Sequence, residues 1–127
     1  EQEDGVKLLG FIEKPEELLI GCDLICLPSY REGFPMVILE AGALRIPALV
    51  SNIPGNVDTV VSKETGLIFD LNDHEDLKMK LTSLIENKKL REELGNNAYK
   101  RVVEKFSDDT ICEIYMSEYN KLYEKIF

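Results

Sequence analysis

Positive charge is scarce in the first part of this 127-residue sequence. The net charge is −9, and residues 1–73 carry 5 basic and 13 acidic side chains, whereas residues 74–127 carry 10 and 11. This deficit argues against nucleic acid or an anionic membrane surface as a direct partner. A polyanionic ligand in the first part would therefore need backbone N–H groups or a supplied cation.

Cysteine and histidine are also few. Cys22, Cys26 and Cys112 form no even disulfide framework, and the spacing of the first two is too wide for a CxxC pair. We therefore predict small apolar core residues in a reducing cytosol, and hence a cytoplasmic location. The single histidine, His74, follows Asp73 in a typical helix N-cap pattern, so we expect it on the surface at a helix start.

Long apolar runs are absent from the sequence. None approaches the roughly 20 residues that span a bilayer, and no charged-then-apolar leader opens the chain. A composition of 44% hydrophobic and 31% charged residues is typical of one globular domain.

Short apolar runs alternate with helical patterns over the first two thirds of the chain. Four runs bounded by turn residues predict strands buried on both faces, as in a parallel sheet: residues 6–9, 24–27, 48–51 and 67–69. Helical patterns cover residues 15–21, 35–45 and 55–62. This alternation predicts an α/β domain with a doubly wound, Rossmann-like parallel sheet.

The strand pattern stops at residue 74, and residues 74–127 are predicted to be the C-terminal helices of the same domain. Gly95 interrupts their helical spacing, and Ser107 is the expected N-cap of a last helix over residues 108–126. That helix carries an apolar stripe, whose tyrosines we expect to make core or groove contacts: Ile111, Ile114, Tyr115, Tyr119, Leu122 and Tyr123.

The chain starts without Met and enters a predicted strand almost at once. Four strands make a narrow sheet with an unprotected edge, which natural domains usually cover. We therefore expect residues 1–127 to be part of a larger domain whose first strand–helix units lie upstream.

Residues 28–47 carry the strongest chemical signal. A predicted strand ends at Leu27 and a helix begins near Pro35, and the ligand crevice of an open α/β sheet lies beyond the carboxyl ends of its strands. A helix start offers N–H groups and a positive dipole end, which suit a phosphate. Gly33 permits close approach of the backbone.

Glu40 is the one polar side chain between Met36 and Leu44. A carboxylate on a mostly buried helix must face water, a cation or hydroxyl donors, so its sequence context alone fits a surface role and a ligand role equally. Glu32 lies eight residues earlier, about 12 Å along a helix axis. A sugar, a diphosphate and a ribose beside the helix start would span a similar length.

These residues resemble the donor-site motif of the family 4 retaining glycosyltransferases, which have the GT-B fold and two glutamates separated by seven residues. The resemblance rests on Pro28-Ser29, Glu32-Gly33-Phe34-Pro35, Glu40-Ala41 and Pro47. Further matching motifs follow in the family's order within residues 6–123: Pro54-Gly55-Asn56-Val57-Asp58, Gly66-Leu67-Ile68-Phe69 and Arg-x-x-Leu-Gly at residues 91–95.

The resemblance implies that residues 1–127 are a partial donor-binding domain from the C-terminal half of such an enzyme. It implies transfer of a hexose from a nucleoside-diphosphate sugar to a saccharide or lipid-linked acceptor with retained configuration, in polysaccharide or glycolipid biosynthesis. No cofactor and no metal are expected. The implied partners are the nucleoside-diphosphate sugar and an N-terminal acceptor domain outside the chain, so the chain alone is expected to be inactive.

The same resemblance implies roles for individual residues. Glu40 would bind the nucleotide ribose, and Glu32 would be catalytic beside the transferred sugar. The other donor-binding positions lie on two loops: Ser29, Gly33, Phe34 and Pro35 on one, and Gly10, Phe11 and Ile12, which border the base, on the other.

Four positions depart from the family pattern. Arg45 stands where a Gly is typical, Gly42 replaces a larger residue, Pro54 replaces a Gly and Asp58 replaces a Glu. The Arg and Lys that grip phosphate in the family belong to a first strand–helix unit that this sequence does not contain. These departures concern substrate identity and loop geometry more than the fold.

Two other classes of protein share the predicted fold. A non-catalytic module would bind the nucleotide through Glu32 and Glu40 without transfer. A signalling receiver needs an acidic pair after its first strand and a phospho-acceptor aspartate at a strand end, and Leu27-Pro28-Ser29 and Ser51-Asn52 supply neither.

Overall fold

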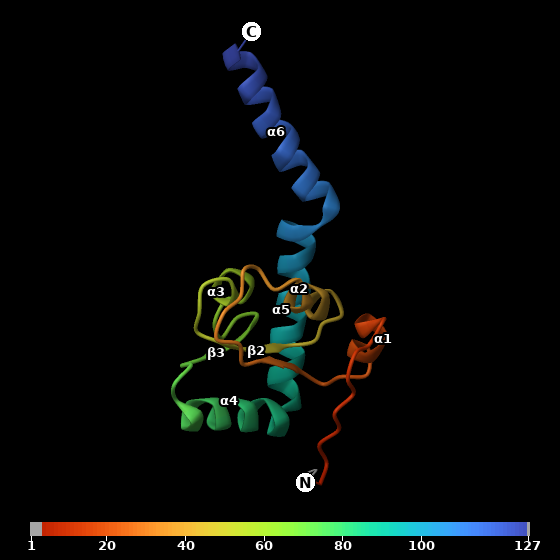
Figure 1. The fold of residues 1–127 in the computed structure, drawn as a ribbon, viewed down its shortest axis with the longest axis vertical. Coiled ribbons are helices and arrows are strands. Elements are labelled where there is room, and N and C mark those ends of the chain that lie inside the picture. The colour runs from red at the N-terminus through yellow and green to blue at the C-terminus, as the bar shows by residue number, and fades with distance from the viewer. Residues whose placement is uncertain (1–3, 127) are drawn as a thin grey trace.

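A computed structural model describes residues 4–126, which contain a three-stranded parallel sheet with helices on both faces (Figure 1). The strands are β1 (Ile25–Leu27), β2 (Ala48–Ser51) and β3 (Gly66–Phe69), and β2 lies between the other two. Both pairings are parallel. The doubly wound α/β prediction is therefore confirmed.

Six helices accompany the strands in the described part of the chain. Those within the sheet region are α1 (Pro15–Leu19), α2 (Met36–Ala43) and α3 (Asn56–Thr59). The remaining three follow β3 without a further strand, as predicted, and are α4 (His74–Glu86), α5 (Lys88–Phe106) and α6 (Asp108–Ile126). His74 is exposed at the start of α4, also as predicted.

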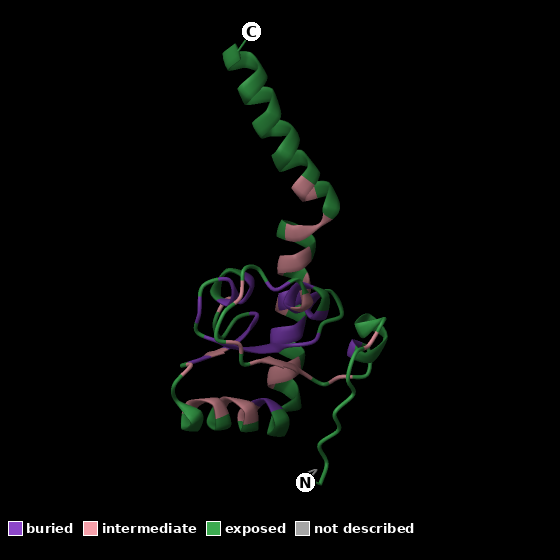
Figure 2. Cartoon of the chain, in the orientation of Figure 1, coloured by how far each residue is buried: buried purple, intermediate pink, exposed green. Residues whose placement is uncertain are grey.

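Alternate strand residues build two apolar cores, one on each face of the sheet. Leu49, Leu67 and Phe69 pack with Leu84 of α4 and Leu94 of α5. The opposite face carries a separate cluster formed by β2, α2 and Val60: Ala48, Val50, Ile38 and Val60. Figure 2 shows this burial concentrated around the sheet. Because both faces are covered, β2 is buried throughout, which explains its continuous apolar sequence.

The predicted strand at residues 6–9 is wrong. These residues form no strand in the structure, and Leu8 is 85% exposed. An apolar strand is stable when other strands and helices cover it, and none of the three described strands pairs with this segment. The sequence pattern shows an apolar run. It does not show whether strands that would pair with this run are present among the described residues.

Gly95 does not interrupt α5, contrary to the sequence prediction. It lies inside the helix, and a Cβ at this position would collide with the Arg45 carbonyl oxygen. A Cβ on Gly42 of α2 would lie 3.1 Å from Cγ2 of Val102 on α5. The two glycines therefore let α2 and the turn after it approach α5 closely.

Arg45 adopts a left-handed backbone with φ 62°, which explains why glycine is common at this place in the resembling family. A side chain costs about 1 kcal/mol in this conformation. The Arg45 guanidinium lies 3.9 Å from the centroid of the Tyr99 ring, and its Nη1 donates to Asn96 Oδ1 at 2.9 Å. These two contacts with α5 offset part of the backbone strain.

We predict that Arg45→Gly destabilises the protein less than Arg45→Ala, by about 1 kcal/mol in the free energy of unfolding. Both variants lose the contacts with Tyr99 and Asn96, but only glycine relieves the strain. Lys63 has φ 65°, so the pair Lys63→Gly and Lys63→Ala is the control and should show the same order. Denaturant unfolding measures both pairs, and an alanine variant more stable than its glycine counterpart would contradict the account.

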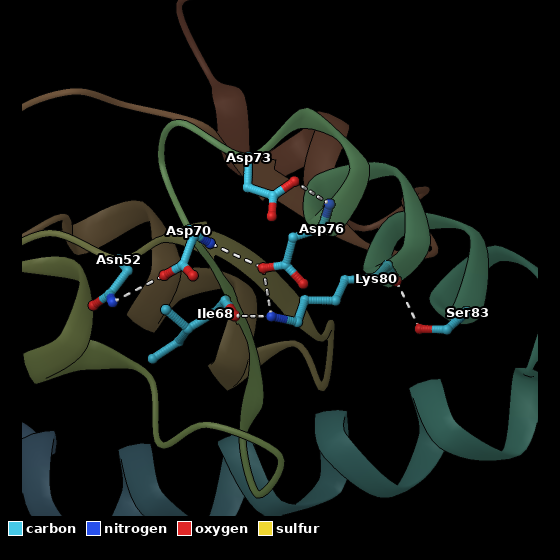
Figure 3. A network of polar contacts seen from close by, with 7 residues as sticks. All are labelled: Asn52, Ile68, Asp70, Asp73, Asp76, Lys80 and Ser83. Atoms are coloured by element: carbon cyan, nitrogen blue, oxygen red, sulfur yellow. Dashed lines mark hydrogen bonds and ion pairs between the residues drawn. The ribbon is translucent and has the colours of Figure 1, made fainter.

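A polar network joins the end of β3 to the start of α4 (Figure 3). Asp73 caps α4 by accepting a hydrogen bond from Asp76 N–H at 3.0 Å. The Asp76 carboxylate in turn accepts from Asp70 N–H at 3.0 Å and from Lys80 Nζ at 2.7 Å. Lys80 also donates to the Ile68 carbonyl at 2.8 Å. These bonds hold the chain where it leaves the sheet.

The hydrogen bond from Lys80, reinforced by the Asp70 N–H, holds the pKa of Asp76 below its usual value of 3.8. A lowered carboxyl pKa adds stability that is complete above the usual pKa and is lost as the pH falls through the folded-state value. We predict that Asp76→Asn lowers the melting temperature at pH 7 and that this difference shrinks below about pH 4.

Glu75→Gln is the control for the Asp76 prediction because Glu75 lies in the same first turn of α4. It should change the melting temperature less than Asp76→Asn does at pH 7. An equal loss at pH 7 and pH 3 in Asp76→Asn would show that the network does not depend on the charged carboxylate.

Helix α6 projects beyond the rest of the described chain (Figures 1 and 2). Ser107 caps it by accepting from Thr110 N–H at 3.3 Å, as predicted. The expected core contacts of its apolar stripe are wrong for the described residues, because α6 has no buried residue and Tyr119 is 65% exposed. Cys112 is likewise exposed rather than in the core, whereas Cys22 and Cys26 are half-buried. No helix within residues 4–126 is long and apolar enough to cross a membrane.

Candidate functional site

Three loops meet the carboxyl edge of the sheet. Residues 28–35 follow β1, residues 52–55 follow β2 and residues 70–73 follow β3. Because the strands are parallel, all three loops leave from the same edge. This edge is where open α/β sheets bind ligands.

The loop after β1 holds most of the predicted site residues. Ser29 Oγ donates a 2.7 Å hydrogen bond to Glu32 Oε1, and both side chains are half-buried. The bond restricts the Glu32 carboxylate and leaves it further acceptor positions for a ligand. The structure thus brings these two predicted residues into direct contact.

A buried network that the sequence analysis missed supports this loop. Ser51, at the end of β2, donates from its hydroxyl to the Ser29 carbonyl. Asn56 Nδ2 donates to both the carbonyl and the hydroxyl oxygen of Ser51, each at 3.1 Å. Ser51 and Asn56 are both fully buried. The signal available in the sequence was a serine that ends an apolar strand, followed five residues later by an asparagine after a glycine.

Gly55 brings the second loop against the first. Its φ is 88°, and a Cβ would collide with the Gly33 carbonyl and lie 2.9 Å from the Glu32 carbonyl oxygen. Only glycine fits both this backbone conformation and this contact. The turn at residues 54–56 is therefore one wall of the candidate site.

Helix α2 starts directly beside Gly33 and Phe34. Its N-cap residue is Pro35, which is buried and supplies no side-chain hydrogen bond. The N–H groups of the first turn carry the positive end of the helix dipole and are suited to an anion. Glu40 lies further along α2 and is exposed, so its carboxylate can accept hydrogen bonds from a ligand.

The predicted base-binding turn is not in contact with these loops in the structure. Gly10 has φ 68°, Phe11 is 94% exposed and Ile12 is half-buried. In Figure 1 this segment extends away from the sheet beside α1. Its role in binding the base remains a prediction.

The candidate site has little side-chain positive charge. Between positions 28 and 44 the sequence has one basic residue, Arg31, and two acidic residues, Glu32 and Glu40. A diphosphate at this edge would therefore depend on backbone N–H groups, as the charge distribution of the sequence indicates.

An open hollow of about 250 Å³ lies at the opposite, amino edge of the sheet. Two of its three basic side chains have acidic partners, Lys88 with Glu92 at 3.7 Å and Arg91 with Asp23 at 3.4 Å, and the third, Arg45, donates to Asn96. This pairing makes the hollow a weaker candidate than the carboxyl edge for an anionic ligand.

A parallel α/β sheet with polar loops and an uncapped helix start at its carboxyl edge defines the doubly wound class of α/β domain, which binds ligands at that edge. The family model described as "Glycosyl transferases group 1" matches residues 1–101. The chain therefore belongs to the group 1 glycosyl transferases.

Two relatives show how much of a family member this chain represents. It is 38% identical to the capsular polysaccharide biosynthesis glycosyltransferase CapM of Staphylococcus aureus over 94% of this chain and 31% of CapM. A Campylobacter jejuni N-acetylgalactosaminyltransferase that acts on a diphospho-undecaprenol-linked sugar is 33% identical, over 96% of this chain and 32% of that protein. The chain spans about a third of the length of these relatives.

Solved structures support the same family. TarM from S. aureus, crystallised with UDP, has a TM-score of 0.83 and 26% identity over 91% of this chain and 24% of TarM. Anabaena HepE, crystallised with UDP and glucose, has a TM-score of 0.80 and 25% identity over 91% of this chain and 33% of HepE. These structures are GT-B glycosyltransferases, so the described domain has the fold that the sequence motifs predicted.

We predict that Asn56→Ala destabilises the protein by about 1–3 kcal/mol, because it removes the Nδ2 group that donates to the buried hydroxyl and carbonyl oxygens of Ser51. Asn52→Ala is the control. Asn52 is exposed and makes a single long side-chain bond, at 3.4 Å, to Asp70, so its loss should cost about 0.5 kcal/mol or less. Denaturant unfolding measures both variants, and equal stabilities would show that the buried network does not support the loop.

Proposed function

We propose that this chain is the donor-binding part of a retaining glycosyltransferase that transfers a hexose from a nucleoside-diphosphate sugar. The observations that carry the proposal are Glu32, in the loop that packs against the turn at Gly55, and the exposed Glu40 further along α2. Anabaena HepE has been crystallised with UDP and glucose and with UDP-glucose, which supports this donor class. The lipid-linked sugar in the Campylobacter relative's name supports a saccharide or lipid-linked acceptor.

In this proposal Glu40 accepts hydrogen bonds from the ribose hydroxyls. The N–H groups at the start of α2, with the backbone at Gly33 and Phe34, face the diphosphate and stabilise the charge that develops as the bond from the sugar to the phosphate oxygen breaks. Glu32, held by Ser29 Oγ, orients the transferred sugar. The acceptor hydroxyl oxygen then bonds to the same face of the anomeric carbon that the diphosphate leaves and gives its proton to the departing phosphate oxygen, so the configuration is retained.

The proposal includes partners outside this chain. An N-terminal domain would bind the acceptor, and further cationic groups would contact the diphosphate, since Arg31 is the one basic side chain of the loop. We propose a cytoplasmic enzyme for polysaccharide or glycolipid biosynthesis that requires no bound metal. The alternative is a non-catalytic module of the same fold, in which donor binding occurs without transfer.

We predict that Glu40→Gln in the full-length protein weakens nucleoside-diphosphate binding by about ten- to a hundredfold. The substitution removes the charge from hydrogen bonds that contribute about 1.5–3 kcal/mol. Folding should be unchanged because Glu40 is exposed. Glu32→Gln should instead lower turnover more than it weakens nucleoside-diphosphate binding, because Glu32 is placed beside the sugar.

Titration calorimetry with UDP, and with GDP and ADP for comparison, separates these roles when it is combined with steady-state rates on the matching sugar nucleotides. Glu86→Gln, an exposed glutamate at the end of α4, is the control and should change neither quantity. Unchanged affinity in Glu40→Gln together with a lower melting temperature would make Glu40 structural. Donor binding without transfer in the wild type would favour the non-catalytic module.

A further inference from the structure

The donor loop has a contact that neither the family motif nor the proposed chemistry uses. The ring of Phe34 lies against the ring of Phe106, with centroids 5.8 Å apart and planes inclined by 49°. Phe106 is the last residue of α5, directly before the Ser107 that caps α6. An aromatic side chain at the end of the predicted phosphate-binding loop, directly before the N-cap of α2, therefore rests on the end of a helix from the C-terminal region.

Arg101 extends this contact to the second loop. Its guanidinium carbon lies 5.4 Å from the centroid of the Phe106 ring, and its Nη2 donates to the Asp58 carbonyl at 3.1 Å. Asp58 lies in α3, which begins immediately after Gly55. The Arg101 Nε is buried and has no hydrogen-bond partner among the described residues. The contacts that hold the Arg101 guanidinium are therefore the Phe106 ring and the Asp58 carbonyl, although its Nε donor is left without a partner within residues 4–126.

Together these contacts form a closed circuit that joins the loop after β1 to the start of α3. Phe34 meets Phe106, Phe106 meets Arg101, and Arg101 holds Asp58. The second loop then returns to the first, because Gly55 packs on the Gly33 carbonyl. Both walls of the site are therefore attached to one end of α5. A loop supported on two sides opens less often than one supported on one side.

We propose that Phe106 and Arg101 are positioning residues for the donor site. They fix the loop after β1 and the start of α3 relative to each other, so that the N–H groups near Gly33 and Phe34 already face the diphosphate before it binds. The identity of the ligand in this proposal, a nucleoside diphosphate, rests on the proposed function. Preorganised donors bind more tightly because less ordering is needed when the ligand arrives.

The experiment uses the full-length protein and two measurements. Hydrogen exchange without ligand reports how often residues 30–35 and 54–59 open, and calorimetry with UDP reports binding. Phe106→Leu keeps an apolar side chain but removes the ring, and Phe106→Tyr keeps the ring. Val103→Ala is the control, because Val103 lies near the same end of α5 and is 48% exposed.

We expect Phe106→Leu to speed exchange in both segments about two- to tenfold and to raise the UDP dissociation constant by a similar factor, as the usual strength of an aromatic pair implies. Phe106→Tyr should keep the exchange rates and the UDP dissociation constant near their wild-type values, and Val103→Ala should change neither. Arg101→Met should speed exchange mainly at residues 54–59. Combining Phe34→Leu with Phe106→Leu should weaken binding little more than the larger single effect, because the two rings act as a pair.

Two outcomes would overturn the proposal. One is unchanged exchange in Phe106→Leu, and the other is faster exchange with unchanged UDP affinity. A wild-type protein that binds none of UDP, GDP and ADP would contradict the proposed function and the ligand-binding half of this inference. The ligand-free exchange rates would still show whether Phe106 and Arg101 fix the loops.

Discussion

The packing of α5 against α2 and the turn after it is the constraint on which the rest of the structure depends. At Gly95 the backbone of α5 meets the Arg45 carbonyl, and at Gly42 the backbone of α2 meets the Val102 side chain. Such close approach is possible because these positions have no side chain. It places Leu94 against one face of the sheet and the end of α5 beside the loops of the candidate site.

The loops at the carboxyl edge of the sheet have a backbone held by close packing and few basic side chains. Gly55 presses one loop on another, and the buried Ser51 and Asn56 hold the chain beneath them. Fixed N–H groups can bind an anion without lysine or arginine, because their orientation is set in advance and needs no reorganisation when charge develops. This property suits a domain whose first 73 residues carry a large excess of acidic side chains. Such a site binds well only if its loops stay in place. The contact between Phe34 and Phe106 matters for this reason.

Much of the fold could be predicted because the apolar patterns are local. The runs ending at Leu27, Ser51 and Phe69 became strands, and Ser107 and Asp73 capped helices as expected. Residues 6–9 failed because an apolar run does not reveal whether neighbouring strands are present. The stripe of α6 failed for a similar reason, since its period predicts a helix with an apolar face but not what covers that face.

The candidate site was predictable where a residue is unusual for its surroundings. Glu40 stands out on an apolar helix, and Gly33 lies next to a helix start. Asn56, Arg101 and Phe106 could not be found in this way, because their contacts join segments 5 to 72 positions apart that only the folded chain brings together. The strained φ of Arg45 was equally hidden, although its place in a position typical of glycine was visible in the sequence.

The most direct test of the central claim is hydrogen exchange of the full-length protein with and without saturating UDP. The account predicts protection concentrated in residues 30–40 and 52–59, the two walls of the carboxyl edge, because their N–H groups and their loops are ordered by the diphosphate and the ribose. Protection confined to residues 20–23, 44–47 and 88–92, around the hollow at the amino edge, would contradict it. That result would place the nucleotide at the amino edge of the sheet instead of the carboxyl edge.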